Sequence, residues 1–203
     1  FRSENVWNVT ALSPEPVSAE MKARASSRSI SGVVTLCLAD AGEPIGCLAT
    51  TYTFTPELFE EQCLAGFLGV DAEPSKEGLA FRLEREERLG TTYAGVLVDR
   101  AHAGVAHSLN WDVLPVAVPG GKQHAKLSLL VWSHSVRLIV ASANLTVPGY
   151  RINREVALAS DFRPGSCDGS LLKSARDFLS QLLDLVPGVA GSQPEVERAS
   201  AFL

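Results

Sequence analysis

Four polar side chains with matched spacing could do chemistry together. His124 and Lys126 are two residues apart at the start of one apolar run, and Ser142 and Asn144 are two apart at the end of the next. Side chains two residues apart on an extended chain point to the same face. If the two runs pair as a hairpin, an imidazole, an ammonium, a hydroxyl and a carboxamide share one pocket. Such a group suits binding of a phosphoryl group and stabilisation of its transition-state charge.

Other chemistries fit these residues less well. No acidic metal ligands stand among them, which argues against a two-metal phosphoesterase, and we expect neither a metal nor a cofactor. A hydrolase built from Ser142, His124 and Glu155 lacks the G-x-S-x-G elbow that would support it. The glycines before Lys122 do not have P-loop spacing. A lone histidine on a strand is more often structural, so the case for His124 depends on its neighbours.

The elements that must position these residues follow from the apolar pattern. Residues 125–132 and 136–141 read as two strands joined by the polar turn 133–135. Helices are predicted over 56–68, with Thr55 as N-cap and Gly69 as terminator, and over 170–185, with Asp168 as a plausible cap. Residues 79–89 fit a charged helix or a strand. Further strands are expected at 45–54, 91–98, 113–118 and 155–159. The order predicts an α/β domain, a mixed β-sheet flanked by helices on its faces.

Composition limits the partners and the compartment. The 203 residues carry a net charge of −5 and show no basic stripe, so an anionic substrate would need a local basic pocket or the basic surface of a partner. The four cysteines have no zinc-site spacing, and Cys47 and Cys63 are expected to be buried thiols. This usage fits a reducing compartment, and we expect a cytoplasmic protein. No apolar run is long enough to span a membrane.

The polar residues also resemble a known motif. His124-Ala-Lys126, then Ala141-Ser142-Ala143-Asn144, then Glu155 have the spacing of the His-x-Lys (HKD) motif of the phospholipase D superfamily. Residues 51–61 look like the start of its nuclease-like members, which extends the resemblance to about residues 30–190. The family's Asp, five residues after the Lys, is replaced by Val131. Tyrosyl-DNA phosphodiesterases also lack that Asp, so the sequence is more similar to that branch and to nuclease-like relatives than to lipid-cleaving enzymes.

The resemblance implies a mechanism. One histidine attacks phosphorus and forms a phosphohistidine, and a second protonates the leaving oxygen and then activates water. His124 is the expected nucleophile, Lys126 and Asn144 would hold phosphoryl oxygens with Ser142 beside them, and Glu155 would orient an imidazole. Substrate phosphates could also contact two flanking cations, Lys122 and Arg151. The implied activity is that of a metal-independent phosphodiesterase or nuclease, a hydrolase that binds DNA or another nucleic acid.

The resemblance also implies that the site is half of a whole. The family uses two His-x-Lys motifs, and none of the other histidines, His102, His107 and His134, has Lys two residues on. The second half-site would come from a missing C-terminal segment or from a homodimer. We therefore expect an N-terminal extension at 1–30, partly irregular, a phospholipase D-like half domain at 31–190, and a segment at 191–203 truncated before a second half. The alternative is a catalytically inactive phospholipase D-like module that binds nucleic acid or a protein partner.

Overall fold

A mixed six-stranded sheet forms the centre of the protein. The structure, a computed structural model, describes residues 40–73, 75–104, 110–165, 169–188 and 193–203. Its strands lie in the order β3-β2-β1-β4-β5-β6. In chain order they are β1 (Pro44–Thr51), β2 (Tyr93–Asp99), β3 (Asp112–Val116), β4 (Leu127–Trp132), β5 (Ser135–Ala141) and β6 (Ala157–Phe162). β1, β2 and β3 are parallel, whereas β4, β5 and β6 are antiparallel to their neighbours.

The hairpin of β4 and β5 lies inside this sheet, as the sequence predicted. β4 pairs with β1 on one side and with β5 on the other, and β6 forms the edge beyond β5. The register runs from Leu127 opposite Val140 to Trp132 opposite Ser135, so the turn consists of Ser133 and His134. A continuous apolar pattern in both strands follows from this interior position, because both faces of the sheet are covered.

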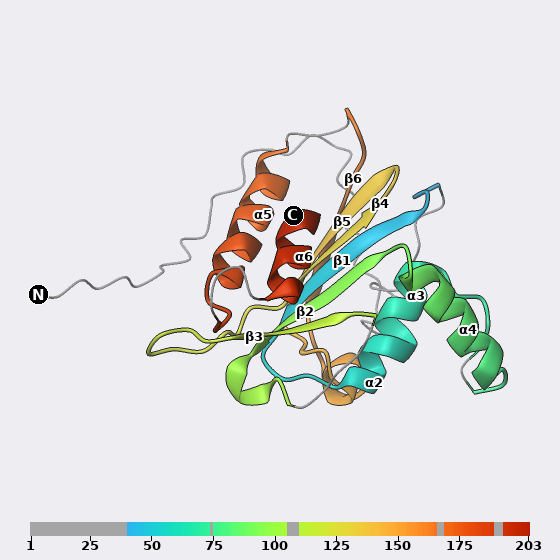
Figure 1. The fold of residues 1–203 in the computed structure, drawn as a ribbon, viewed down its shortest axis with the longest axis horizontal. Helices are drawn as coiled ribbons and strands as arrows, with labels where there is room; N and C mark the ends of the chain where they lie inside the picture. The colour runs from blue at the N-terminus through green and yellow to red at the C-terminus, as the bar shows by residue number, and fades with distance from the viewer. Residues whose placement is uncertain (1–39, 74, 105–109, 166–168, 189–192) are drawn as a thin grey trace, which may run out of the picture.

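Helices cover the two faces, which confirms the α/β fold class (Figure 1). On one face lie α2 (Pro56–Leu58), the π-helical η1 (Phe59–Leu64), α3 (Ala65–Leu68) and α4 (Gly78–Leu89); α5 (Ser170–Leu183) and α6 (Pro194–Phe202) lie on the other. β1 contributes side chains to both cores. Cys47 and Ala49 belong to the core beneath α2–α4, and Leu48 belongs to the core beneath α5 and α6. This alternation is that of a strand between two layers.

Several local predictions can be compared with the observed elements. The helix predicted over 56–68 forms without a break after Thr55 and ends at Gly69, whose φ of 69° is left-handed. The ambiguous segment 79–89 is helical as α4. Cys47 and Cys63 are buried free thiols, and burial raises the pKa of each to about 12. Asp168 and residues 1–39 lie outside the described residues.

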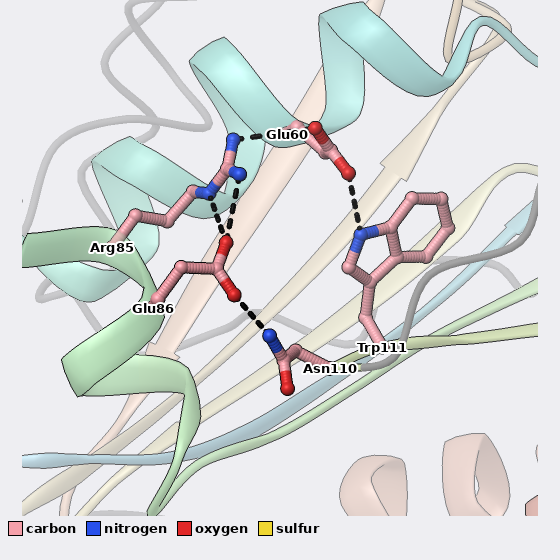
Figure 2. Close-up of polar contacts among 5 residues, drawn as sticks. All are labelled: Glu60, Arg85, Glu86, Asn110 and Trp111. Atoms are coloured by element: carbon pink, nitrogen blue, oxygen red, sulfur yellow. Dashed lines mark hydrogen bonds and ion pairs between the residues drawn. The ribbon is translucent and has the colours of Figure 1, made fainter. Parts of the chain in front are cut away.

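A polar network ties the α2–α4 layer to the start of β3 (Figure 2). Arg85 of α4 pairs with Glu60 of η1 at 3.2 Å and with Glu86 at 2.8 Å. Glu60 also accepts a 2.9 Å bond from the Trp111 indole, and Glu86 accepts one from Asn110. The Arg85 side chain is only 12% exposed, and a charge so little exposed is costly without partners. The two carboxylates pair with it and offset that cost. In the described part of the chain, no helix combines the length and the hydropathy needed to cross a membrane.

Candidate active site

The segment that carries His124 is not part of a strand. β4 begins at Leu127, so the strand predicted from residue 125 starts two residues later, and both His124 and Lys126 precede it. Here the backbone groups bond to buried side chains and not to the backbone of a neighbouring strand. Gln123, 2% exposed, accepts a 2.6 Å bond from the Ala125 N–H and donates to the Ala125 carbonyl at 3.2 Å. The Thr50 hydroxyl donates to the Ala125 carbonyl and accepts from the Leu127 N–H, both at 2.9 Å.

A buried carboxylate fixes the start of the same segment. Asp99, at the end of β2, is 6% exposed and accepts a 2.8 Å bond from the Gln123 N–H. Its other oxygen accepts from the Ala101 N–H at 3.0 Å, which caps the short 3₁₀ helix η2 (Arg100–His102). Asp99 thereby joins η2 to the His124 segment, so the positions of His102 and His124 depend on one carboxylate.

His124 and Lys126 form a direct pair. The Lys126 Nζ lies 3.0 Å from His124 Nδ1, 3.4 Å from Nε2 and 2.7 Å from the His124 carbonyl oxygen. Lys126 is 8% exposed while the imidazole is exposed, so the ammonium lies beneath the ring. Burial lowers the pKa of Lys126, and the negative charge of Glu155 partly offsets this. An ammonium only donates, so a ring nitrogen that bonds to it acts as the acceptor.

Asn144 holds the turn after β1. Its Oδ1 accepts bonds from the backbone N–H of Tyr52 at 3.1 Å and of Thr53 at 3.3 Å, and from the Thr51 hydroxyl at 3.4 Å. The amide oxygen is therefore occupied, and the Nδ2 group is the part of Asn144 that can donate to a substrate. This turn carries Tyr52, and the centroid of the Tyr52 ring is 4.9 Å from that of the His124 ring.

Ser142 and Glu155 form a second pair. The Ser142 hydroxyl donates to the Glu155 carboxylate and accepts a 2.9 Å bond from the Val156 N–H. Asn153 donates to the other Glu155 oxygen at 3.2 Å. Glu155 lies just before β6 rather than in it, because the strand predicted over 155–159 begins at Ala157. The electrostatic link between Glu155 and Lys126 connects this pair to the histidine.

The two flanking cations differ in their positions. Lys122 donates a 3.2 Å bond to the Tyr52 hydroxyl, which places it beside the ring that contacts His124. Arg151, in η3 (Pro148–Ile152), instead donates to Gln62 at 3.3 Å and lines a different hollow with Gln62 and Phe81. The structure thus brings Lys122 to the candidate site, and it places Arg151 with η1. A role for Arg151 in contacting substrate stays a prediction.

Val131 stands where the motif has an Asp. Its side chain packs partly buried against the core beneath α5 and α6, and its strand partners are Gly46 and Val136. The position is therefore part of the apolar packing and does not face His124. Among the described residues, no group of three or more His, Cys, Asp or Glu side chains could hold a metal ion.

Sequence reasoning missed the residues that hold the site together: Thr50, Tyr52, Asp99, His102 and Gln123. Tyr52 falls in the stretch 51–61 that already resembled nuclease-like relatives, and this was the available signal for it. Asp99 had none, because its bond to the Gln123 N–H joins residues 24 apart in the chain.

Comparisons with known proteins give likenesses in structure. No family model matches the chain, and no curated protein matches its sequence. The structure resembles yeast tyrosyl-DNA phosphodiesterase with a TM-score of 0.47 and 8% identity, over 78% of this chain. It resembles NucT from Helicobacter pylori with a TM-score of 0.45 and 14% identity, over 79% of this chain and 87% of that one.

A further likeness is to Nuc from Salmonella typhimurium, described as a phospholipase D family member, with a TM-score of 0.41, 13% identity and coverage of 77% of this chain. This is the family whose motif the His124 region resembles. The chain spans only 34% of the yeast phosphodiesterase chain but 84% of Nuc. At these identities the matches record a likeness of fold and assign no activity.

Proposed function

We propose that this chain carries one half-site of a phospholipase D-type, metal-independent phosphodiesterase, with nucleic acid as the substrate. The observation that carries the proposal is the pairing of an exposed imidazole with a buried ammonium, Lys126 Nζ to His124 Nδ1, at 3.0 Å. A phosphoryl oxygen drawn to the ammonium brings phosphorus within reach of the imidazole. That combination supplies both a nucleophile and a countercharge.

The chemistry proceeds in two displacements. A lone pair of His124 forms an N–P bond while the P–O bond to the leaving group breaks, and the leaving oxygen takes a proton from a second imidazole. Water then gives a proton to that second imidazole and forms a P–O bond as the N–P bond breaks. Lys126 and the Nδ2 group of Asn144 stabilise the negative charge that builds on the non-bridging oxygens. The second imidazole belongs to another half-site, in a further segment or a second copy.

A second candidate function is a catalytically inactive module that binds nucleic acid or a protein. The net charge of −5 favours it over a nuclease, because an anionic substrate would need a local basic pocket. The replacement of the motif Asp by Val131 does not favour it, since that position packs beneath α5 and α6.

The decisive experiment measures covalent chemistry at His124. Labelled single-stranded oligonucleotide is incubated in excess EDTA with the complete enzyme, in which both half-sites are present, and the phosphohistidine is trapped at high pH, where it is stable. We expect cleavage to survive EDTA, and His124→Ala to abolish the trapped label and lower turnover by several orders of magnitude. His134→Ala is the matched control, because His134 is an exposed histidine in the β4–β5 turn. Loss of activity on chelation, or full activity in His124→Ala, contradicts the proposal.

The dependence of turnover on protein concentration tests whether this chain carries only half of the site. A monomer of this chain should turn over slowly, and the rate should rise steeply with concentration if a second copy completes the site. Robust turnover by a proven monomer contradicts the two-histidine mechanism. Binding of substrate without turnover at any concentration favours the inactive module.

A further inference from the structure

Three side chains outside the motif, those of Tyr52, His102 and Lys122, lie together beside His124. Tyr52 lies between two imidazoles: its ring centroid is 4.4 Å from that of His102, at 68°, and 4.9 Å from that of His124, at 44°. The Lys122 ammonium is 3.2 Å from the Tyr52 hydroxyl and 5.5 Å from the ring centroid. The three come from three segments, namely the turn after β1, the helix η2 and the loop before β4.

Buried polar groups fix each of these segments. Asn144 Oδ1 binds the backbone of Tyr52 and Thr53, and the Asp99 carboxylate binds both η2 and the His124 segment. The rings are thus held at the surface by contacts beneath them. A ligand that used them would not bear the cost of ordering them.

The exposed parts of this cluster have a distinct chemistry. His102 and Lys122 are exposed and Tyr52 is half-buried, on a chain whose net charge is −5. Flat π surfaces beside an ammonium match a nucleotide, because a base stacks on rings and its phosphate pairs with a cation. A base inside a duplex is already stacked on its neighbours and cannot reach these rings, so the match is to an unpaired base.

We infer that Tyr52, His102 and Lys122 form a nucleotide subsite beside His124, which stacks one unpaired base and holds its phosphate. The inference rests on the proposed function and names its substrate form as single-stranded nucleic acid. Tyr52 supports the stack, His102 presents its exposed outer ring, and Lys122 contacts the phosphate next to the one that is cleaved.

Binding separates this inference from catalysis. The probe is a fluorescent 12-nucleotide oligothymidylate, compared with an abasic strand of equal length and with a duplex. Affinities are measured by anisotropy in a His124→Gln background, where attack is lost. We expect Tyr52→Ala and His102→Ala to weaken binding of the oligothymidylate by about 5- to 150-fold, the range for one stacked base, and to change binding of the abasic strand less than about twofold. Tyr52→Phe should keep the stacking.

Lys122→Ala should act differently. It should weaken both single strands equally and reduce the slope of log affinity against log salt by about 0.7, as loss of one phosphate contact predicts. Arg82→Ala is the control of equal charge, because Arg82 is an exposed cation on α4. His102 is exposed, so His102→Ala gives a folded variant even if Tyr52→Ala does not.

Two results would overturn the subsite. One is an equal loss of affinity for the base-containing and abasic strands on replacing Tyr52 or His102, since no base would then be stacked. The other is cleavage of bis(p-nitrophenyl) phosphate with trapping of phosphohistidine but no affinity for single strands, which would keep the proposed function and remove this substrate. Selective loss of base-dependent affinity in a protein that contains both half-sites and cleaves no diester would support the subsite and contradict the proposed function.

Discussion

Replacing Gln123 by leucine should loosen the segment that carries His124. The Gln123 side chain makes two close bonds to the Ala125 backbone, at 2.6 and 3.2 Å, and a longer one to the Leu97 carbonyl at 3.4 Å. Leucine has a similar volume, so a cavity contributes little. Two lost bonds at about 1 kcal/mol each, with an N–H left unpaired, predict destabilisation by about 2–3 kcal/mol. For a chain of this size that lowers Tm by about 4–12 °C.

The measurement is equilibrium unfolding in urea, followed by circular dichroism, alongside the rate of phosphodiester cleavage. Arg82→Ala is the control, because Arg82 is exposed on α4 and its loss should change stability by about 0.5 kcal/mol or less. The cleavage rate should fall in Gln123→Leu even where the protein remains folded. A loss of stability below about 0.5 kcal/mol would refute the role assigned to Gln123.

A double-mutant cycle tests whether Gln123 and Thr50 act together. Both side chains donate to the Ala125 carbonyl, so each can partly compensate for the other. Thr50→Val combined with Gln123→Leu should therefore cost more than the sum of the single changes, by about 0.5 kcal/mol or more. Strict additivity would mean that the two residues do not hold one segment.

Three other outcomes follow from the charges around the site and from the sheet. Burial lowers the pKa of Lys126, so cleavage should fall as alkaline pH removes its charge, earlier than for an ordinary lysine; Glu155→Gln should move the fall to still lower pH in a pH–rate profile. Asp161→Ala should destabilise the protein by about 1–3 kcal/mol in urea, because it strips the nearly buried Arg137 of a two-bond partner at 2.6 and 2.9 Å. Val131→Asp should lower Tm without raising activity. A gain of activity at full stability would contradict this, because it would show that the absence of the motif Asp limits catalysis.

The strands and helices were predictable where the pattern is local. The apolar runs of β4 and β5, and the turn between them, depend on residues adjacent in sequence, and the predicted hairpin is confirmed. The same holds for the helix that begins after Thr55 and stops at Gly69. In each case short-range geometry alone selects the structure.

The prediction of the strand start was wrong, because side chains distant in sequence replace the hydrogen bonds between strands there. Periodicity extended the strand back to residue 125, but the Ala125 carbonyl bonds to Thr50 and Gln123 side chains. Nothing in the sequence near Ala125 marks that change, because Thr50 is 75 residues away. The motif identified Asn144 as a group for substrate, and only the structure shows that its oxygen is bound to the turn at Tyr52 and Thr53.

The position of His124 therefore depends on residues that carry no chemistry of their own. The segment before β4 leaves the sheet, and its backbone groups would be costly if buried without partners. Asp99, Gln123 and Thr50 satisfy them, and in doing so they set where the imidazole and the ammonium meet. A chain that kept the His-x-Lys spacing but lost these three side chains would still match the motif, yet its imidazole and ammonium would have no fixed geometry. The spacing brings His124 and Lys126 together, and the buried polar side chains beneath them fix the geometry of the candidate site.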